Sequence, residues 1–332
     1  MAAIEMTPDG HRPRALVTGA AGFLGSHLSE KLLELGHEVV GADGFTPYYD
    51  RAYKEANLSG LRGRPGFTFH ELDLRSAPLS GLLEGVGWVF HQAAQPGVRA
   101  SWDEGFAEYA GHNLVATQRL LEAARRAVVS RFVFASSSSV YGLVAEGEVS
   151  EEEPLRPLSP YGVTKVGSEK LVEVYHREFG LHTVSLRYFT VCGPRQRPDM
   201  AFHRILDALH HEREFPLFGD GSQERDFTYV ADAVLANVLA AEKGRAGEVY
   251  NIGGGRPTRL SRAIEVLEEV VGKRARIRRL PRADGDPART AADLRRAHRD
   301  LGYAPTVPVD EALRLEAAWF AGPGGPLARE RR

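Results

Sequence analysis

The sequence predicts an α/β fold in which a doubly wound parallel sheet is followed by a smaller C-terminal α/β region. Between residues 14 and 129, short apolar β-type runs alternate with segments of helical periodicity, which is typical of repeated βαβ units. A glycine-rich turn follows the first of these runs. After residue 187 the chain becomes rich in proline, glycine and arginine, which indicates shorter elements and more loops.

The expected elements follow in chain order. Five apolar runs are the expected strands of the large sheet: residues 15–17, 39–42, 88–90, 132–134 and 183–187. Helical periodicity covers residues 22–36, 106–127 and 160–179. Residues 227–252 have the pattern of a strand, a helix and a strand, so we expect this segment to return to the large sheet. The predicted domains are therefore 1–187 joined by 226–253, and 188–225 with 254–332. The chain before residue 13 and from residue 322 is expected to be frayed.

Composition narrows the functional class. The chain has 332 residues, 43% of them hydrophobic, which is enough for a large core. No apolar run approaches the roughly 20 residues that span a bilayer, and the first residues lack a signal-peptide core, so we expect a cytoplasmic protein without membrane association. The net charge of -2 gives no electrostatic footprint for nucleic acid. A single cysteine, Cys192, and histidines without ligand spacing imply no metal.

The turn after the first expected strand has the spacing of a dinucleotide-binding loop. Gly19 permits a tight turn, Gly22 lets the backbone approach a pyrophosphate, and Gly25 lets helix and sheet pack closely. The second expected strand ends in Asp43. A carboxylate there accepts hydrogen bonds from both hydroxyls of the adenosine ribose and repels a 2′-phosphate, so NAD is expected rather than NADP. Asp73 is expected either beside the adenine or as a turn residue.

A tyrosine and a lysine in one expected helix predict a proton-transfer site. Tyr161 and Lys165 share one helix face, and Ser159 and Pro160 place them near its start as N-cap and first residue. A nearby ammonium favours the phenolate, so this tyrosine can act as a general base. The serine tract 136–139 follows a β-type run and puts a hydroxyl at the carboxyl edge of the sheet. Each feature alone is ordinary, but together after a nucleotide loop they predict a catalytic site.

These motifs make the chain similar to the extended short-chain dehydrogenases/reductases that process nucleotide sugars, NAD-dependent epimerases and dehydratases with a Rossmann-type sheet and a smaller substrate-binding region. The resemblance covers nearly the whole chain. It rests on TGAAGFLG at 18–25, Asp-Leu at 73–74, HQAAQPGVR at 91–99, SSSSVYG at 136–142, SPYGVTK at 159–165 and RDFTYV at 225–230.

The resemblance implies roles for individual residues. Tyr161 is the base, Lys165 holds the tyrosine and the nicotinamide ribose, and Ser137, or else Ser138, binds the reacting oxygen. The implied neighbours of NAD are Gly19, Gly22, Phe23, Leu24, Asp43, Asp73, Leu74, Ala93, Ala94, Gln95, Asn113, Tyr161, Lys165, Tyr188 and Val191. Two helices of the family, here near 104–127 and 160–179, usually pair with their copies, which implies a homodimer.

The serine tract also indicates the reaction. Enzymes that resemble this chain first oxidise the carbon-4 hydroxyl of the sugar. The 4,6-dehydratases then use an Asp-Glu pair just before the Val-Tyr-Gly, and the uronate decarboxylases a Glu. Ser138 and Ser139 stand at those positions, and neither can act as a carboxylate acid or base. The family pattern therefore implies a 4-epimerase, which needs no such group.

Three segments resemble UDP-glucuronate 4-epimerases: residues 48–50, 93–99 and 187–200, although Cys192 stands where a tyrosine is expected. Oxidation of this uronate at carbon 4 gives a β-keto acid that loses carbon dioxide readily, so the carboxylate must be held. We expect Arg197, with Thr190 and Arg99, to hold it. An equally open alternative is that Arg197 only anchors its own loop through backbone hydrogen bonds.

The resemblance also implies a nucleotide subsite. Arg225 and Arg282 are expected at the diphosphate and Leu217 with Phe218 at the uracil, although Arg278 or Arg279 could replace Arg282 if the register differs. Asp284 and Asp286 are expected to order this loop.

Three other functions stay open. A UDP-glucose/UDP-galactose 4-epimerase would use the same serine, tyrosine and lysine, and a UDP-glucuronate decarboxylase the same first step. A catalytically silent NAD-binding regulatory protein would retain the fold alone.

Overall fold

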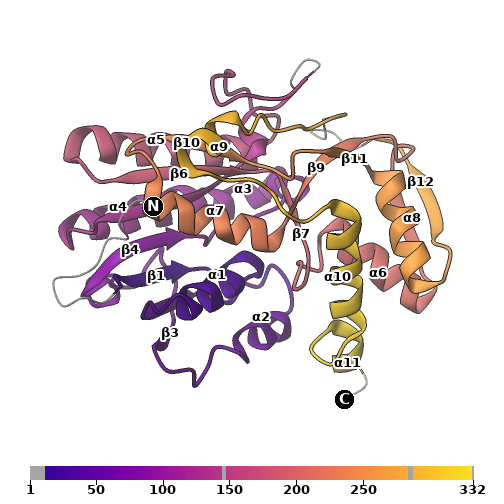
Figure 1. The fold of residues 1–332 in the computed structure, drawn as a ribbon, viewed down its shortest axis with the longest axis horizontal. Coiled ribbons are helices and arrows are strands. Elements are labelled where there is room, and N and C mark those ends of the chain that lie inside the picture. The colour runs from indigo at the N-terminus through magenta and orange to yellow at the C-terminus, as the bar shows by residue number, and fades with distance from the viewer. Residues whose placement is uncertain (1–11, 144–146, 283–286, 331–332) are drawn as a thin grey trace.

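Seven parallel strands form the central sheet, in the order β10-β6-β5-β4-β1-β2-β3 (Figure 1). The structure, a computed structural model, describes residues 12–143, 147–282 and 287–330. The strands of the sheet are β1 (Arg14–Thr18), β2 (Val39–Asp43), β3 (Phe67–Glu71), β4 (Val86–His91), β5 (Arg131–Ser137), β6 (Thr183–Tyr188) and β10 (Val249–Ile252). The order reverses between β1 and β4, and the carboxyl ends of strands at such a point border the ligand crevice of doubly wound folds.

Helices cover both faces of this sheet. Its inner strands have mostly apolar middles, and every residue of β2 is buried, because a parallel sheet is covered on both sides. One face packs against α1 (Phe23–Glu34), α7 (Val230–Lys243) and α9 (Arg295–Leu301). The other packs against α4 (Ala116–Arg126) and α5 (Pro160–Phe179). The predicted doubly wound fold is confirmed.

A second core lies beside the large sheet, at the right of Figure 1. It contains α6 (Ala201–His211), α8 (Leu260–Val271) and α10 (Val309–Ala321), with the parallel pair β8 (Glu214–Phe218) and β12 (Arg276–Leu280). A three-stranded sheet of β7 (Thr190–Cys192), β9 (Glu224–Tyr229) and β11 (Pro257–Arg259) adjoins it. Within residues 227–252, α7 and β10 join the large sheet, whereas β9 pairs with β7 and β11.

Shorter elements connect these layers. They are α2 (Arg51–Leu58), α3 (Phe106–Tyr109), the π-helix η4 (Ala110–Val115) and the 3-10 turns η1 (Gly81–Leu83), η2 (Arg99–Ser101), η3 (Asp103–Gly105) and η5 (Ser138–Val140). The helix expected over residues 106–127 is thus α3, η4 and α4 in succession. None of the described helices is long and apolar enough to cross a membrane.

The expectation of a frayed chain from residue 322 is wrong for the described part. Helix α11 (Pro326–Glu330) follows α10 and packs against it. Glu330 accepts a hydrogen bond of 2.8 Å from His211, and the Arg329 guanidinium lies 4.4 Å from the centre of the Tyr53 ring. The polar composition looked solvated because these partners lie far away in the sequence.

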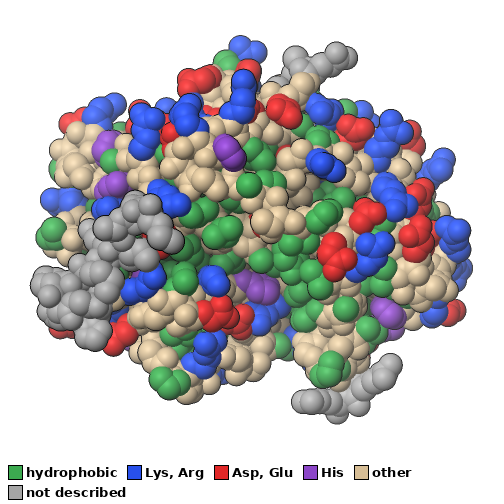
Figure 2. All heavy atoms as spheres, in the orientation of Figure 1, with side chains coloured by type: hydrophobic (Ala, Val, Ile, Leu, Met, Phe, Trp, Pro, Cys, Tyr) green, Lys and Arg blue, Asp and Glu red, His purple; other side chains and the backbone are tan. Residues whose placement is uncertain are grey.

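Charged side chains of both signs are interspersed over the face seen in Figure 2. This distribution matches the near-neutral net charge of the chain. A nucleic-acid-binding face, by contrast, gathers basic side chains in one patch or stripe.

Candidate active site

A cavity of about 390 Å³ lies at the carboxyl edge of the sheet. Its walls come from the glycine turn, from the ends of β2, β4, β5 and β6, and from the start of α5. Most of the expected cofactor residues line it: Gly19, Gly22, Phe23, Leu24, Asp43, Asp73, Leu74, Ala93, Ala94, Tyr161, Lys165, Tyr188 and Val191. The loop expected to bind a dinucleotide and the helix expected to carry the catalytic pair therefore meet in one site.

The glycine turn has the close contacts that a dinucleotide loop requires. Gly19 has a φ of +71°, and a Cβ there would lie 2.9 Å from the backbone nitrogen of Ala93. A Cβ on Gly25 would lie 2.1 Å from the carbonyl oxygen of Gly19. Gly22 is the N-cap of α1 and has no side chain to bind the first backbone N–H groups. These groups and the helix dipole face the cavity, so the turn fits a pyrophosphate.

Asp43 reaches the cavity with a cation beside it. Its Oδ1 accepts hydrogen bonds from the backbone nitrogen of Phe45 and from Nζ of Lys54, at 2.8 and 2.9 Å. Lys54 is buried, comes from α2 and also lines the cavity. Asp73 likewise lines the cavity, while its Oδ1 accepts from the backbone of Arg75 at 2.8 Å, so it is a turn residue, and its place beside the adenine stays a prediction.

Two expected cofactor neighbours, Gln95 and Asn113, are buried and lie outside the lining of the cavity. Asn113 sits in the π-helix η4. Its amide accepts from the backbone nitrogen of Gln95 at 2.8 Å and donates to the hydroxyl of Thr164 at 2.9 Å. The wider turn of a π-helix aims this side chain between the β4 loop and α5. Asn113 therefore holds the cavity wall from behind, and its expected contact with NAD stays a prediction.

Tyr161 and Lys165, the expected catalytic pair, lie in the first turns of α5, as predicted. Ser159 caps the helix, accepting from the backbone of Gly162 at 3.1 Å, and proline follows as its first residue. Burial raises the pKa of Tyr161, opposed by a hydrogen bond with Ser137 and by the charge of Arg197. The Tyr109 ring packs edge-on against it, 6.1 Å away between centroids.

Lys165 departs from the expectation that it bonds to the tyrosine. Its Nζ donates to the carbonyl oxygen of Ala135 at 2.8 Å, and burial lowers its pKa to about 8, opposed by Glu169. The lysine is therefore anchored to the end of β5. The cation that favours the Tyr161 phenolate in this structure is Arg197.

The structure separates the serines of the tract. Ser136 is buried and its hydroxyl donates to Glu169, on the side of the sheet covered by α5. Ser136 also borders the cavity, but its hydroxyl is committed to Glu169. Ser137 lines the cavity and bonds with Tyr161, while Ser138 begins η5 at the cavity wall.

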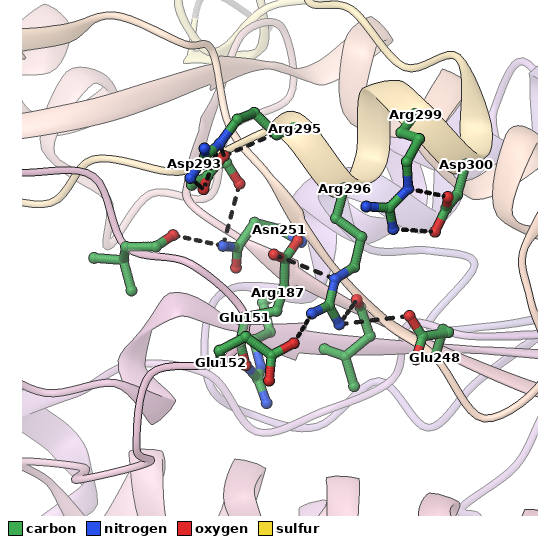
Figure 3. A network of polar contacts seen from close by, with 12 residues as sticks. Glu151, Glu152, Arg187, Glu248, Asn251, Asp293, Arg295, Arg296, Arg299 and Asp300 are labelled. Atoms are coloured by element: carbon green, nitrogen blue, oxygen red, sulfur yellow. Dashed lines mark hydrogen bonds and ion pairs between the residues drawn. The ribbon is translucent and has the colours of Figure 1, made fainter.

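Behind Ser136 runs a buried polar network. Arg187 donates to both oxygens of Glu169, at 2.9 and 2.7 Å, and to the hydroxyl of Tyr141 at 2.9 Å. Arg187 also reaches the backbone oxygen of Glu151 at 3.2 Å. Figure 3 shows how this region continues to Arg296 of α9, which pairs with Glu151, Glu152 and Glu248. This network connects the end of β5 to α5 and β6 and, through Glu151, to α9 near the C-terminus.

A second cavity, of about 490 Å³, adjoins the first. The two share the walls Tyr48, Gly97, Val98, Ser138, Ser139 and Thr190. Arg225, Leu217 and Phe218 line the second cavity, as expected for a nucleotide subsite. Arg99 lines it too, with its guanidinium 4.0 Å from the centre of the Phe218 ring. Arg99 therefore lies in the second cavity, whereas Arg197 lines the first, and the expected contact of Arg99 with the sugar carboxylate stays a prediction.

Arg282 is exposed and lies against Gly219, outside the lining of both cavities. The sequence did not decide which arginine of this basic run would bind the diphosphate, since Arg278 and Arg279 precede Arg282 in the same run. Asp284 and Asp286 lie outside the described residues.

Arg197 and Thr190 line the first cavity together with Tyr161. Among the described residues, the Arg197 guanidinium donates to no backbone oxygen. Its guanidinium pairs with the carboxylate of Asp199, two residues further on. Sequence reasoning gave no site role to Tyr48, Tyr49, Lys54 and Asp199. The tyrosines lay in a segment already singled out for its resemblance, but the partners of Lys54 and Asp199 are visible only in the fold.

Comparisons with known proteins agree with this site. Residues 15–253 match the model of the NAD dependent epimerase/dehydratase family. The chain belongs to that family. It is 46% identical to an uncharacterised UDP-glucose epimerase, YtcB, of Bacillus subtilis (strain 168), over 93% of this chain and 98% of that protein. It is 36% identical to a UDP-glucuronate 4-epimerase of Thermodesulfobacterium geofontis (strain OPF15), over 92% and 95% of the two chains.

A solved structure is similar throughout. The UDP-glucuronic acid 4-epimerase of Bacillus cereus, in complex with UDP-glucuronic acid and NAD, is 44% identical, with a TM-score of 0.90 over 92% of this chain and 98% of that one. The family is NAD dependent, so the dinucleotide expected at the glycine turn is NAD. Like its relatives, the chain is an enzyme.

Proposed function

We propose that this enzyme is a UDP-glucuronate 4-epimerase, which interconverts UDP-glucuronate and UDP-galacturonate through a 4-keto sugar. The observation that carries the proposal is that Arg197 and Thr190 line the same cavity as Tyr161 and Ser137. A neutral sugar gives a guanidinium no carboxylate to bind at this position, whereas a uronate does. The relatives named for UDP-glucuronate support the same substrate.

The chain's own residues transfer one proton and hold the reacting oxygen. Bound NAD supplies the acceptor and later the donor of a hydride at carbon 4. The Tyr161 phenolate takes the proton of the 4-hydroxyl and returns it, while the Ser137 hydroxyl holds the oxygen through a hydrogen bond. The Arg197 charge opposes the burial that raises the tyrosine's pKa. Lys165, held at Ala135, keeps a positive charge at the edge of the sheet below pH of about 8.

The walls of the first cavity favour epimerisation over elimination. At positions 138 and 139 the chain offers two hydroxyls, which cannot serve as the carboxylate acid or base of a dehydratase. The second cavity suits the nucleotide: Arg225 for the diphosphate, and Leu217 with Phe218 for the base. Arg99, stacked on Phe218, would close this subsite over the uracil.

The proposal also covers the oligomeric state of the enzyme, the roles of its two domains and its location in the cell. Of the large apolar side chains exposed between residues 102 and 179, Phe106 is on α3, Val115 on η4, and Val163, Val174 and Phe179 on α5, while Trp102, Val128 and Leu143 lie outside these helices. Exposed apolar side chains on α3, η4 and α5 suit pairing with a second copy, so we propose a homodimer. We also propose that residues 1–187 with 226–253 form the domain that holds NAD, and that residues 188–225 with 254–332 form the domain that holds the UDP-sugar. The proposed location of the enzyme is the cytoplasm.

Incubation of the purified enzyme with UDP-glucuronate, with the products resolved by NMR, tests the function. The expected product is UDP-galacturonate. A UDP-pentose as the main product would instead assign a decarboxylase. Faster turnover of UDP-glucose than of UDP-glucuronate would assign the neutral-sugar epimerase. Binding of NAD without reaction of any UDP-, dTDP- or GDP-sugar would indicate a silent regulatory protein.

A further inference from the structure

Asp199 holds the guanidinium of Arg197 by one edge. Nε donates to Oδ1 at 2.9 Å and Nη2 donates to Oδ2 at 3.0 Å. A guanidinium has five N–H groups in a fixed plane, and this pairing uses two of them on the same side. The N–H groups of Nη1 and one of Nη2 remain for a second anion. The carboxylate therefore fixes the direction in which the other edge of Arg197 points.

Asp199 is itself held by a second segment of the chain, far away in the sequence. The hydroxyl of Tyr48, in the segment after β2, donates to Oδ2 at 3.2 Å. The position of this hydroxyl leaves no room for a side chain on Gly97, because a Cβ there would lie 2.3 Å from it, and Gly97 has a φ of +100°. Tyr109 in turn donates to the carbonyl oxygen of Gly97 at 2.8 Å. Tyr48 and Asp199 thus connect three segments of the chain around Arg197.

We propose that Asp199, supported by Tyr48, is a positioning residue that aims Arg197 at the sugar carboxylate and thereby keeps the enzyme from losing carbon dioxide. This inference rests on the proposed function, because it concerns the fate of a uronate. Asp199 lines the second cavity and Arg197 the first, so the pair stands where the two meet. Arg197 is also close enough to Tyr161 for its charge to lower that tyrosine's pKa.

The chemistry explains why direction matters. In the 4-keto sugar, decarboxylation breaks the bond between carbon 5 and the carboxyl carbon. The electron pair of that bond enters the enolate of the ketone, carbon dioxide leaves, and carbon 5 then takes a proton. The bond breaks readily only when it is aligned with the π system of the ketone. A guanidinium fixed in one plane holds the carboxylate in one orientation, whereas a guanidinium that swings does not.

The test is the ratio of UDP-pentose to UDP-galacturonate formed from UDP-glucuronate. For Asp199→Asn we expect the ratio to rise about tenfold, the effect of losing one charge-assisted hydrogen-bonded contact. Arg197→Ala should raise it further, and Tyr48→Phe less. Asp207→Asn is the matched control, since Asp207 lies on α6 and pairs with His211 and Arg213 away from both cavities. Its ratio should equal that of the wild type.

The outcomes separate this inference from the proposed function. If the wild type converts no UDP-glucuronate, the function is wrong. If the wild type epimerises and Asp199→Asn lowers the rate at an unchanged product ratio, Asp199 has only a structural role and the inference is overturned. If Asp199→Asn does not fold, as judged by loss of NAD binding, Tyr48→Phe decides. That variant must raise the ratio without changing NAD binding, and an unchanged ratio overturns the inference.

Discussion

The hydroxyl of Ser136 donates a hydrogen bond to Oε1 of Glu169, one helical turn beyond Lys165. Ser136 borders the cavity, but this contact commits its hydroxyl to Glu169. Ser137, the next residue, is the serine that bonds with Tyr161. Arg187 pairs with both oxygens of Glu169, so each of these two buried side chains has an ionic partner.

We expect Ser137→Ala to lower kcat by about a hundredfold to a thousandfold, the usual effect of removing a hydrogen bond to the reacting oxygen. Ser138→Ala should lower it by less than about tenfold, because Ser138 is a wall residue without the bond to Tyr161. Steady-state rates with UDP-glucuronate, with NAD content as the check on folding, measure both. Equal losses for the two variants would refute this assignment.

A second prediction concerns pH. The pKa of Lys165 is lowered from 10.5 to about 8, mainly by burial, and the charge of Glu169 opposes that shift. Activity that requires the ammonium is present below this pKa and falls as pH rises through it. Glu169→Gln removes the opposing charge, so the alkaline fall should move to lower pH. Glu173→Gln is the control, since Glu173 lies exposed on the same helix and pairs with Lys170 at 2.7 Å. A profile of kcat against pH that is identical for both variants would contradict the coupling.

A third prediction concerns the choice of cofactor. Lys54 lies 2.9 Å from the Asp43 carboxylate, and both buried side chains line the part of the cavity that is expected to hold the adenosine ribose. Asp43→Asn removes the charge that repels a 2′-phosphate and releases the Lys54 ammonium to bind one. The affinity for NADP relative to NAD should rise about tenfold or more, as judged from the value of a charged hydrogen bond.

Calorimetric titration of the two dinucleotides measures this ratio. Adding Lys54→Met to the Asp43→Asn variant should cancel the gain in NADP affinity. A gain that survives the second substitution would show that Lys54 takes no part in it.

Much of the site could be predicted because its residues stand in local patterns. The glycine turn follows a strand and begins a helix, and Ser159 with Pro160 marks the start of α5 at the residue where the structure has it. Buried parallel strands are short apolar runs, so the large sheet was also recognisable. In each case neighbours in the sequence decide the local structure.

The rest depends on contacts between distant residues. Tyr48 meets Asp199 across 151 positions, and His211 meets Glu330 across 119. Arg99 was expected at the sugar, but its place is decided by the ring of Phe218 from the other half of the chain. Arg282 is one of several arginines in a basic run, and no sequence pattern there decides which of them would bind the diphosphate. No local periodicity encodes such pairings, so the sequence could name the residues of the site but not all their positions.

The central claim is that Tyr161 and its neighbours hold a 4-keto sugar while one hydride leaves carbon 4 and returns to it. Turnover of UDP-glucuronate carrying deuterium at carbon 4, followed by NMR in ordinary water, tests this most directly. The account predicts UDP-galacturonate with the deuterium retained at carbon 4. Loss of the label to water would contradict it.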